Sequence, residues 1–159
     1  MILVLLGTHE LPFQRLLDEI ETLKNSGKIE EEIVVQSGHT DFKSKEMKII
    51  PFINYDELEE LYEQASLIIT HAGTGSVITG LKKDKRVIAA PRLKQHGEHN
   101  DDHQLELAKV FEESGHILIW NDGDDLEEII QISRQFSPNK FISQKKKMLG
   151  LLEDYIDNI

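Results

Sequence analysis

Short runs of apolar residues alternate along this chain with segments in which apolar residues recur every three or four positions. The runs predict strands at Ile2–Leu6, Glu32–Gln36, Met47–Pro51, Leu67–Thr70, Arg86–Ala90 and His116–Trp120. The segments between them predict helices near residues 13–23, 58–65, 77–83, 105–111 and 126–130, with Asp122 to Asp125 as cap candidates for the last. This alternation predicts an α/β fold with a Rossmann-like, mostly parallel sheet and helices on both faces.

The chain length favours one domain. The 159 residues contain no linker, repeat or low-complexity segment, so we expect a single domain over residues 1–159. After Pro138, apolar residues at positions 141, 148, 151, 152, 155 and 156 predict a C-terminal amphipathic helix over residues 138–159. We expect this helix to pack on its own sheet, and binding to a partner is the alternative.

Charge and composition exclude several classes of protein. The net charge of −11, from 29 acidic and 18 basic residues, opposes binding to nucleic acid or to anionic lipid. No apolar run approaches the ~20 residues needed to cross a bilayer, and no cysteine is present to form a disulfide or a thiolate metal site. We therefore expect a cytoplasmic protein without nucleic acid as a partner and without a membrane span of its own.

The strand at Leu67–Thr70 is followed by His71-Ala72 and then by Gly73-Thr74-Gly75-Ser76, after which a helix begins. Backbone N–H groups at a helix N-terminus attract phosphate. Ile78 stands where a dinucleotide-binding motif needs glycine, and no Gly-Lys-Ser/Thr follows to make a P-loop. The loop therefore predicts a generic diphosphate site, with a tight packing turn as the alternative.

Other polar segments follow the predicted strands at the same edge of the sheet. They are Gly7-Thr8-His9, Gly38-His39 and Pro91-Arg92. Ligands of parallel α/β sheets bind beyond the carboxyl ends of the strands, so these segments are expected to converge with the Gly73 loop on one site.

The segment from Pro91 to Gln104 is rich in polar residues. Its histidines at positions 96, 99 and 103 raise the possibility of zinc, but no compact ligand set is completed, so no metal is expected. Asp102, His103 and Gln104 together offer the mixed hydrogen-bond donors and acceptors that suit a sugar.

Taken together, these motifs resemble the nucleotide-sugar-binding half of GT-B glycosyltransferases, of the glycosyltransferase family 28 type. The resemblance is carried by residues 4–9, 51–53, 71–76, 91–92 and 97–104. The chain looks most like small soluble subunits of split transferases. One kind adds the second N-acetylglucosamine to dolichol-diphosphate-N-acetylglucosamine in eukaryotes; another serves bacterial capsule and exopolysaccharide assembly, often as a β-1,4-galactosyltransferase.

The resemblance implies a UDP-sugar as substrate, with no separate cofactor. By position, the residues that it places around this ligand are Gly7, Thr8, Phe52, Ile53, His71, Gly73, Thr74, Gly75, Ser76, Thr79, Arg92, Asp102, His103 and Gln104. Within this set the Gly73 loop would hold the diphosphate, Phe52 and Ile53 would read uracil, and His103 and Gln104 would read the sugar. Thr79 stands where many relatives have a ribose-binding glutamate. The catalytic base is not identified, with His9 and His71 as weak candidates.

GT-B enzymes have two such domains, and this chain corresponds to one half. The resemblance therefore implies a membrane-associated partner subunit that carries the acceptor domain and recruits this chain to the inner face of the membrane. The expected function is a donor-binding subunit that transfers a hexose, with galactose as the first choice, to a lipid-diphosphate-linked sugar. The alternatives are an N-acetylglucosaminyltransferase subunit, a non-catalytic stabilising subunit, or a free-standing nucleotide-binding enzyme.

Overall fold

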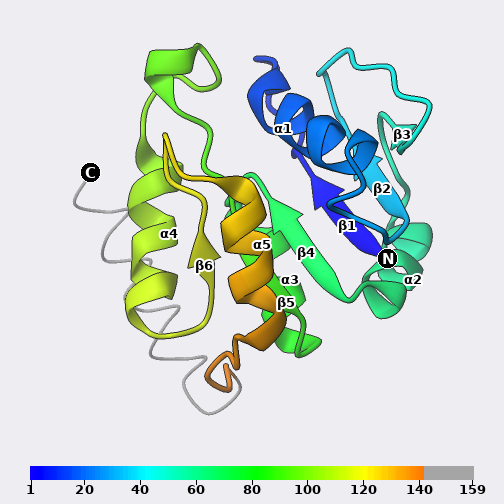
Figure 1. The fold of residues 1–159 in the computed structure, drawn as a ribbon. Coiled ribbons are helices and arrows are strands. Elements are labelled where there is room, and N and C mark those ends of the chain that lie inside the picture. Colours follow the sequence, from blue (N-terminus) through cyan, green and yellow to red (C-terminus); the bar gives the residue numbers. More distant parts are fainter. Residues whose placement is uncertain (142–159) are drawn as a thin grey trace.

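In a computed structural model, the structure describes residues 1–141, which form one sheet of parallel strands with helices on both faces (Figure 1). The strands are β1 (Ile2–Leu5), β2 (Ile33–Gln36), β3 (Lys48–Ile50), β4 (Leu67–Thr70), β5 (Arg86–Ala89) and β6 (Leu118–Ile119). The helices are α1 (Gln14–Asn25), α2 (Tyr55–Gln64), α3 (Thr74–Lys82), α4 (His103–Glu113) and α5 (Leu126–Gln135), with a 3₁₀ turn η1 at Lys94–His96. All six predicted strands and the five predicted helices are confirmed.

The order of strands in the sheet is β3-β2-β1-β4-β5-β6, and every neighbouring pair is parallel. The order reverses direction between β1 and β4, which lie side by side in the middle of the sheet. Ligands of doubly wound sheets bind at such a switch point, beyond the carboxyl ends of the strands. Here those ends are Leu5 of β1 and Thr70 of β4, which are partners in the strand register.

Two apolar clusters hold the layers together, one on each face of the sheet. Alternate residues of β1 divide between them, because successive side chains of a strand point to opposite faces. Ile2 and Val4 pack with α1 and α5, whereas Leu3 and Leu5 pack with α2, α3 and α4. Figure 1 shows α1 and α5 on one side of the sheet. The core thus fixes the loops at the carboxyl edge from both faces.

Local signals explain where the helices begin and end. The side chains of Asn54 and Asp125 accept hydrogen bonds from the backbone N–H groups of Glu57 and Glu127, which caps α2 and α5. Gly115 follows α4 with a φ of 75°, a left-handed conformation that glycine adopts without strain, as predicted.

The predicted C-terminal helix lies largely outside the described residues. Residues 138–141 are described and are not helical, so a helix over the whole of residues 138–159 is wrong at its start. Phe141 is buried, and its ring lies edge-on to His116 at 5.6 Å between ring centroids. None of the helices within residues 1–141 is both long enough and apolar enough to span a membrane.

Candidate functional site

The loops that follow β1 and β4 meet around the ring of His71. A Cβ atom added to Gly7 or to Gly73 would lie 2.5 Å or 2.6 Å, respectively, from the imidazole. Only glycine leaves room for the ring at these two positions, and Gly7 also has a left-handed φ of 74°. The predicted convergence of these two loops at the carboxyl edge of the sheet is therefore confirmed.

Gln104 fixes which ring nitrogen of His71 carries the proton. Its side-chain oxygen accepts a hydrogen bond from the backbone N–H of Arg92 at 3.1 Å, so its NH₂ group donates to Nδ1 of His71 at 3.0 Å. Burial, reinforced by the charge of Arg92, lowers the pKa of His71 to about 4. His71 is thus neutral at pH 7, with its proton on Nε2. In this state it presents a hydrogen-bond donor, and the geometry favours a structural or donor role over that of a base.

The N-terminus of α3 presents unpaired backbone N–H groups. Val77 donates its N–H to the carbonyl of Gly73, which leaves those of Thr74, Gly75 and Ser76 without a backbone partner in the described structure. The Ser76 hydroxyl donates to the Gly73 carbonyl at 2.9 Å and lies 2.6 Å from the hydroxyl of Thr70. The side chains therefore brace the loop, and its backbone is left to bind a ligand.

A cavity of about 170 Å³ lies next to this helix N-terminus, between α2 and α3. We call it the α2–α3 cavity, and its lining residues are Leu5, Gly7, Gln36, Tyr55, Leu58, Glu59, Tyr62, His71, Gly75, Ser76 and Thr79. Five of the predicted site residues line it, namely Gly7, His71, Gly75, Ser76 and Thr79. The hydroxyl of Tyr62 on α2 donates to the carbonyl of Ser76 on α3 at 3.1 Å. This hydrogen bond links the two helices that form the walls of the cavity.

The side chain of Arg92 has a structural role. Its side chain is fully buried, and its guanidinium donates to the carbonyls of Leu6, Leu11 and Glu98 at 2.7, 2.6 and 3.0 Å. A guanidinium committed to backbone carbonyls inside the fold does not reach a ligand. The side chain of Arg92 therefore holds the loops after β1 and β5 together, and the placement of Arg92 beside the UDP-sugar stays a prediction.

A buried ion pair supports the same loops. Two guanidinium nitrogens of Arg15 on α1, Nε and Nη2, each lie 3.0 Å from an oxygen of the Glu98 carboxylate. Glu98 is only 3% exposed. The same carboxylate accepts the backbone N–H of Leu93 at 3.1 Å. A bidentate pair of this kind fixes the position of the segment after β5 relative to α1.

The histidines of the carboxyl edge form a second group beside His71. The ring of His9 stacks on that of His99 at 4.3 Å, and Asp101 lies 3.2 Å from Nδ1 of His99 and 3.4 Å from Nδ1 of His103. Nδ1 of His9 accepts the backbone N–H of Leu11 at 3.1 Å, and burial followed by the charge of His99 lowers the pKa of His9. Neutral His9, like His71, thus carries its proton on Nε2.

The same region does not assemble the zinc ligands considered for His96, His99 and His103. His96 turns away to Asp122, whose carboxylate lies 2.9 Å from its Nε2. No group of three or more histidine, aspartate or glutamate side chains within residues 1–141 is arranged to hold a metal ion.

Four further predicted site residues do not line the α2–α3 cavity, namely Asp102, Phe52, Ile53 and Thr8. Asp102 accepts the backbone N–H of Lys94 and lines a separate hollow beside Trp120. Phe52 is 55% exposed and meets His39 edge-on at 5.3 Å, and Ile53 follows it ahead of α2. Thr8 is exposed on the loop after β1, next to His9.

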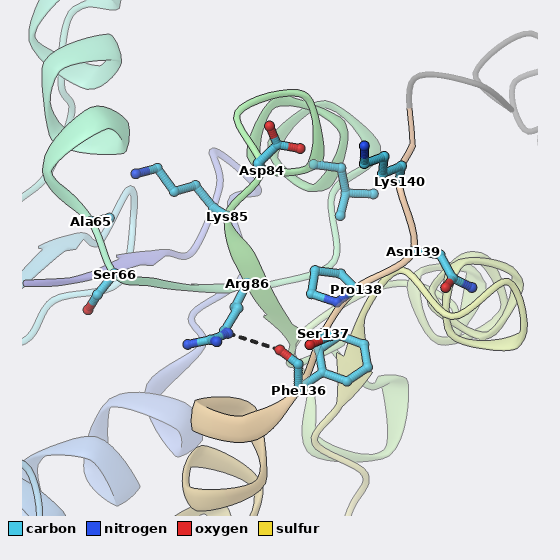
Figure 2. A pocket seen from close by; sticks show the side chains of 11 residues that line it. Ala65, Ser66, Asp84, Lys85, Arg86, Phe136, Ser137, Pro138, Asn139 and Lys140 are labelled. Atoms are coloured by element: carbon cyan, nitrogen blue, oxygen red, sulfur yellow. Dashed lines mark hydrogen bonds between the residues drawn. The ribbon is translucent and has the colours of Figure 1, made fainter.

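A larger cavity, about 460 Å³, is at the opposite edge of the sheet and is lined by none of the predicted site residues. Figure 2 shows it between the start of β5 and the segment after α5, where Nε of Arg86 donates to the carbonyl of Phe136 at 2.9 Å. Parallel α/β sheets bind ligands at their carboxyl edge, so the smaller α2–α3 cavity is the candidate site.

Sequence reasoning missed the residues that α2 contributes. Tyr55, Glu59 and Tyr62 line the cavity, yet Glu59 and Tyr62 fall in a segment whose apolar spacing indicated only a core helix, and Tyr55 precedes that segment. The signal that could have found them is the position of α2, which begins directly after the carboxyl end of β3. Gln36, the last residue of β2, could have been found in the same way.

The chain belongs to the glycosyltransferase family 28 C-terminal domain family, whose model matches residues 1–156. A related curated protein is the UDP-N-acetylglucosamine transferase subunit ALG13 of Candida albicans, 28% identical over 109 residues, which cover 69% of this chain and 36% of the relative. The protein of the same name from Yarrowia lipolytica is 34% identical over 80 residues, which cover 50% of this chain and 39% of the relative. The chain thus spans little more than a third of the length of these relatives.

Solved structures agree on the fold. An NMR structure of ALG13 superposes with a TM-score of 0.56 at 18% identity, covering 92% of this chain and 94% of the other. The calicheamicin glycosyltransferase CalG4 gives a TM-score of 0.59 at 13% identity, covering 92% and 36%. MurG of Acinetobacter baumannii gives 0.52 at 22% identity, covering 83% and 40%. The expected GT-B-type, Rossmann-like fold is confirmed.

Proposed function

We propose that this chain is the donor-binding subunit of a two-component glycosyltransferase and holds the diphosphate of a UDP-sugar at the N-terminus of α3. The observation that carries the proposal is the set of unpaired N–H groups of Thr74, Gly75 and Ser76, because Gly75 and Ser76 line the α2–α3 cavity. Charge-assisted hydrogen bonds from such groups contribute about 1.5–3 kcal/mol each, so two or three account for a large part of nucleotide affinity.

The same N–H groups supply the catalytic contribution of this chain. When the bond between the sugar and UDP breaks, negative charge grows on the leaving diphosphate. Donors already held in place by Thr70, Ser76 and Tyr62 stabilise this charge without having to reorganise. Since His71 and His9 carry their protons on Nε2 when neutral, we propose that the base that activates the acceptor hydroxyl comes from the partner subunit.

The partner is inferred from the family and from the relatives. The chain corresponds to a C-terminal domain family, and its curated relatives are named as transferase subunits. We propose that a membrane-associated partner supplies the acceptor domain and recruits this chain to the cytoplasmic face of the membrane, since its net charge of −11 opposes direct binding to anionic lipid.

The identity of the transferred sugar is a separate part of the proposal. The curated relatives reported above are named UDP-N-acetylglucosamine transferase subunits, and their names give no support to galactose, capsule or exopolysaccharide. We therefore propose N-acetylglucosamine as the transferred sugar in place of galactose. Transfer assays of the complex with UDP-N-acetylglucosamine and UDP-galactose, side by side, decide between them.

Titration with UDP tests the proposal. A Cβ atom at Gly75 would meet no atom within 4 Å, so a side chain there fits the fold and enters the phosphate site. Gly75→Asp places a negative charge at the helix N-terminus, which preserves the helix but repels phosphate. Calorimetry is expected to show UDP binding by the wild-type chain, about tenfold or greater loss in Gly75→Asp, and a smaller loss in the neutral control Gly75→Asn. Equal UDP affinities in the three proteins, or no binding by the wild type, contradict the proposal and favour a non-catalytic stabilising subunit.

A further inference from the structure

One face of α2 forms a wall of the α2–α3 cavity. Tyr55, Leu58, Glu59 and Tyr62 recur at helical spacing along this face and all line the cavity. The facing wall is formed by Gly75, Ser76 and Thr79 of α3. In a nucleoside diphosphate the ribose is joined directly to the phosphates. With the diphosphate at Gly75 and Ser76, the ribose therefore lies in the α2–α3 cavity, between the two helices.

The ribose hydroxyls donate hydrogen bonds and so need acceptors. Thr79 is poorly suited, because its hydroxyl proton is committed to the carbonyl of Gly75 at 2.8 Å and its oxygen is uncharged. Glu59 is the one carboxylate among the cavity-lining residues that the structure describes. A carboxylate accepts two hydrogen bonds at once, and its charge makes each of them stronger than a bond to a neutral oxygen.

The position of Glu59 is set by Lys83. Oε2 of Glu59 lies 2.8 Å from Nζ of Lys83. Within residues 1–141, Oε1 of Glu59 accepts no hydrogen bond. The pairing with Lys83 offsets the negative charge of Glu59 beside an anionic diphosphate. The side chain is 33% exposed, so ligand reaches it without any displacement of the fold. Burial, and then the charge of Glu59, raise the pKa of Tyr62, which agrees with a carboxylate held close to the cavity wall.

We infer that Glu59 is the ribose-binding acid of this chain and accepts the hydrogen bonds of the 2′ and 3′ hydroxyls from α2, on the wall that faces Thr79. This inference rests on the proposed function. It assigns ribose recognition to a residue 20 positions before Thr79 and on a different helix. Specificity for ribonucleotides over deoxyribonucleotides then depends on the pairing of α2 with α3.

Glu63 offers a matched control. It lies one turn after Glu59 on the same helix and pairs with the same lysine, 2.7 Å from Nζ, but it is absent from the cavity lining and 66% exposed. Glu59→Gln and Glu63→Gln therefore remove the same charge from the same ion-pair cluster. Only the first removes a charged acceptor from the cavity.

The experiment measures the dissociation constants of UDP and of 2′,3′-dideoxy-UDP by calorimetry for the full-length wild type and both variants. The wild type and Glu63→Gln are expected to prefer UDP by roughly 10- to 100-fold. Glu59→Gln is expected to bind dideoxy-UDP with the affinity of the wild type. It is expected to lose most of the preference for UDP over dideoxy-UDP. Glu59→Asp keeps the charge but withdraws it from the cavity, because its side chain is shorter. This variant is expected to lose part of the preference for UDP.

The outcomes separate this inference from the proposed function. If the wild type does not bind UDP, the proposed function fails and the inference fails with it. If the wild type binds UDP but the preference is near one, or is unchanged in both Glu59 variants, the diphosphate site stands and the assignment of Glu59 is overturned.

Discussion

The side-chain nitrogen of Gln104 lies 3.0 Å from Nδ1 of His71, and this contact decides which imidazole nitrogen carries the proton. Gln104→Glu replaces the donor with a second, charged acceptor next to Nδ1. A nearby negative charge favours the imidazolium form. We expect the pKa of His71 to rise from about 4 toward its ordinary value, as measured by an NMR pH titration of the ring.

Gln131→Glu serves as the control, because Gln131 is exposed on α5. It adds the same charge far from the site. A pKa for His71 that is equally low in all three proteins contradicts the assigned contact.

His71 also makes the stability of the fold depend on pH. Its pKa is lowered in the folded state, so the unfolded chain binds more protons between pH 6.5 and 4 and stability falls as the pH falls through this window. The full loss is on the order of 3 kcal/mol, from the difference between a pKa of about 4 in the folded state and one of about 6.5 in the unfolded state. Urea unfolding of the wild type and His71→Asn at several pH values is expected to show a steeper loss for the wild type below pH 6.5. Parallel profiles contradict the prediction.

Gly73 and Gly75 are two residues apart in the same loop, but an added Cβ atom would meet the imidazole of His71 only at Gly73. Gly73→Ala forces a Cβ atom against the ring of His71 and is expected to cost about 1–3 kcal/mol of stability. Gly75→Ala meets open space in a helix and is expected to be neutral or slightly stabilising. Thermal unfolding compares the two variants, and equal melting temperatures would show that His71 does not require glycine at position 73.

Arg92 is expected to matter for stability and not for direct contact with the ligand. Arg92→Lys keeps a positive charge but loses most of the hydrogen bonds to the carbonyls of Leu6, Leu11 and Glu98, which should cost about 2–4 kcal/mol. The exposed Arg86 gives the control, since Arg86→Lys should change stability by less than about 0.5 kcal/mol. Similar denaturation midpoints for the two variants contradict the structural role of Arg92.

Much of the fold was predictable because its signals are local. Each strand is a short apolar run, each helix has apolar residues at helical spacing, and Gly115 and Asp125 mark a helix end and a helix start. The convergence of the loops at Gly7 and Gly73 followed from the parallel sheet, since strand ends of the same direction meet at one edge.

The roles of Arg92 and Glu59 were not predictable from local patterns. Whether an arginine after a strand faces the ligand or the interior depends on partners up to 86 positions away, such as the carbonyl of Leu6. Glu59 enters the cavity because Tyr62 links α2 to Ser76 of α3, across 14 positions. Both assignments depend on tertiary packing and needed the structure.

The central claim is that the backbone at the N-terminus of α3 binds the diphosphate of a UDP-sugar. A ¹H–¹⁵N NMR titration of the full-length chain with UDP observes the three N–H groups of Thr74, Gly75 and Ser76 directly. The account predicts large, saturable shifts of these signals, strongly reduced in Gly75→Asp. If these three signals stay unchanged at saturating UDP while signals of the cavity beside Arg86 and Phe136 shift, the claim is wrong.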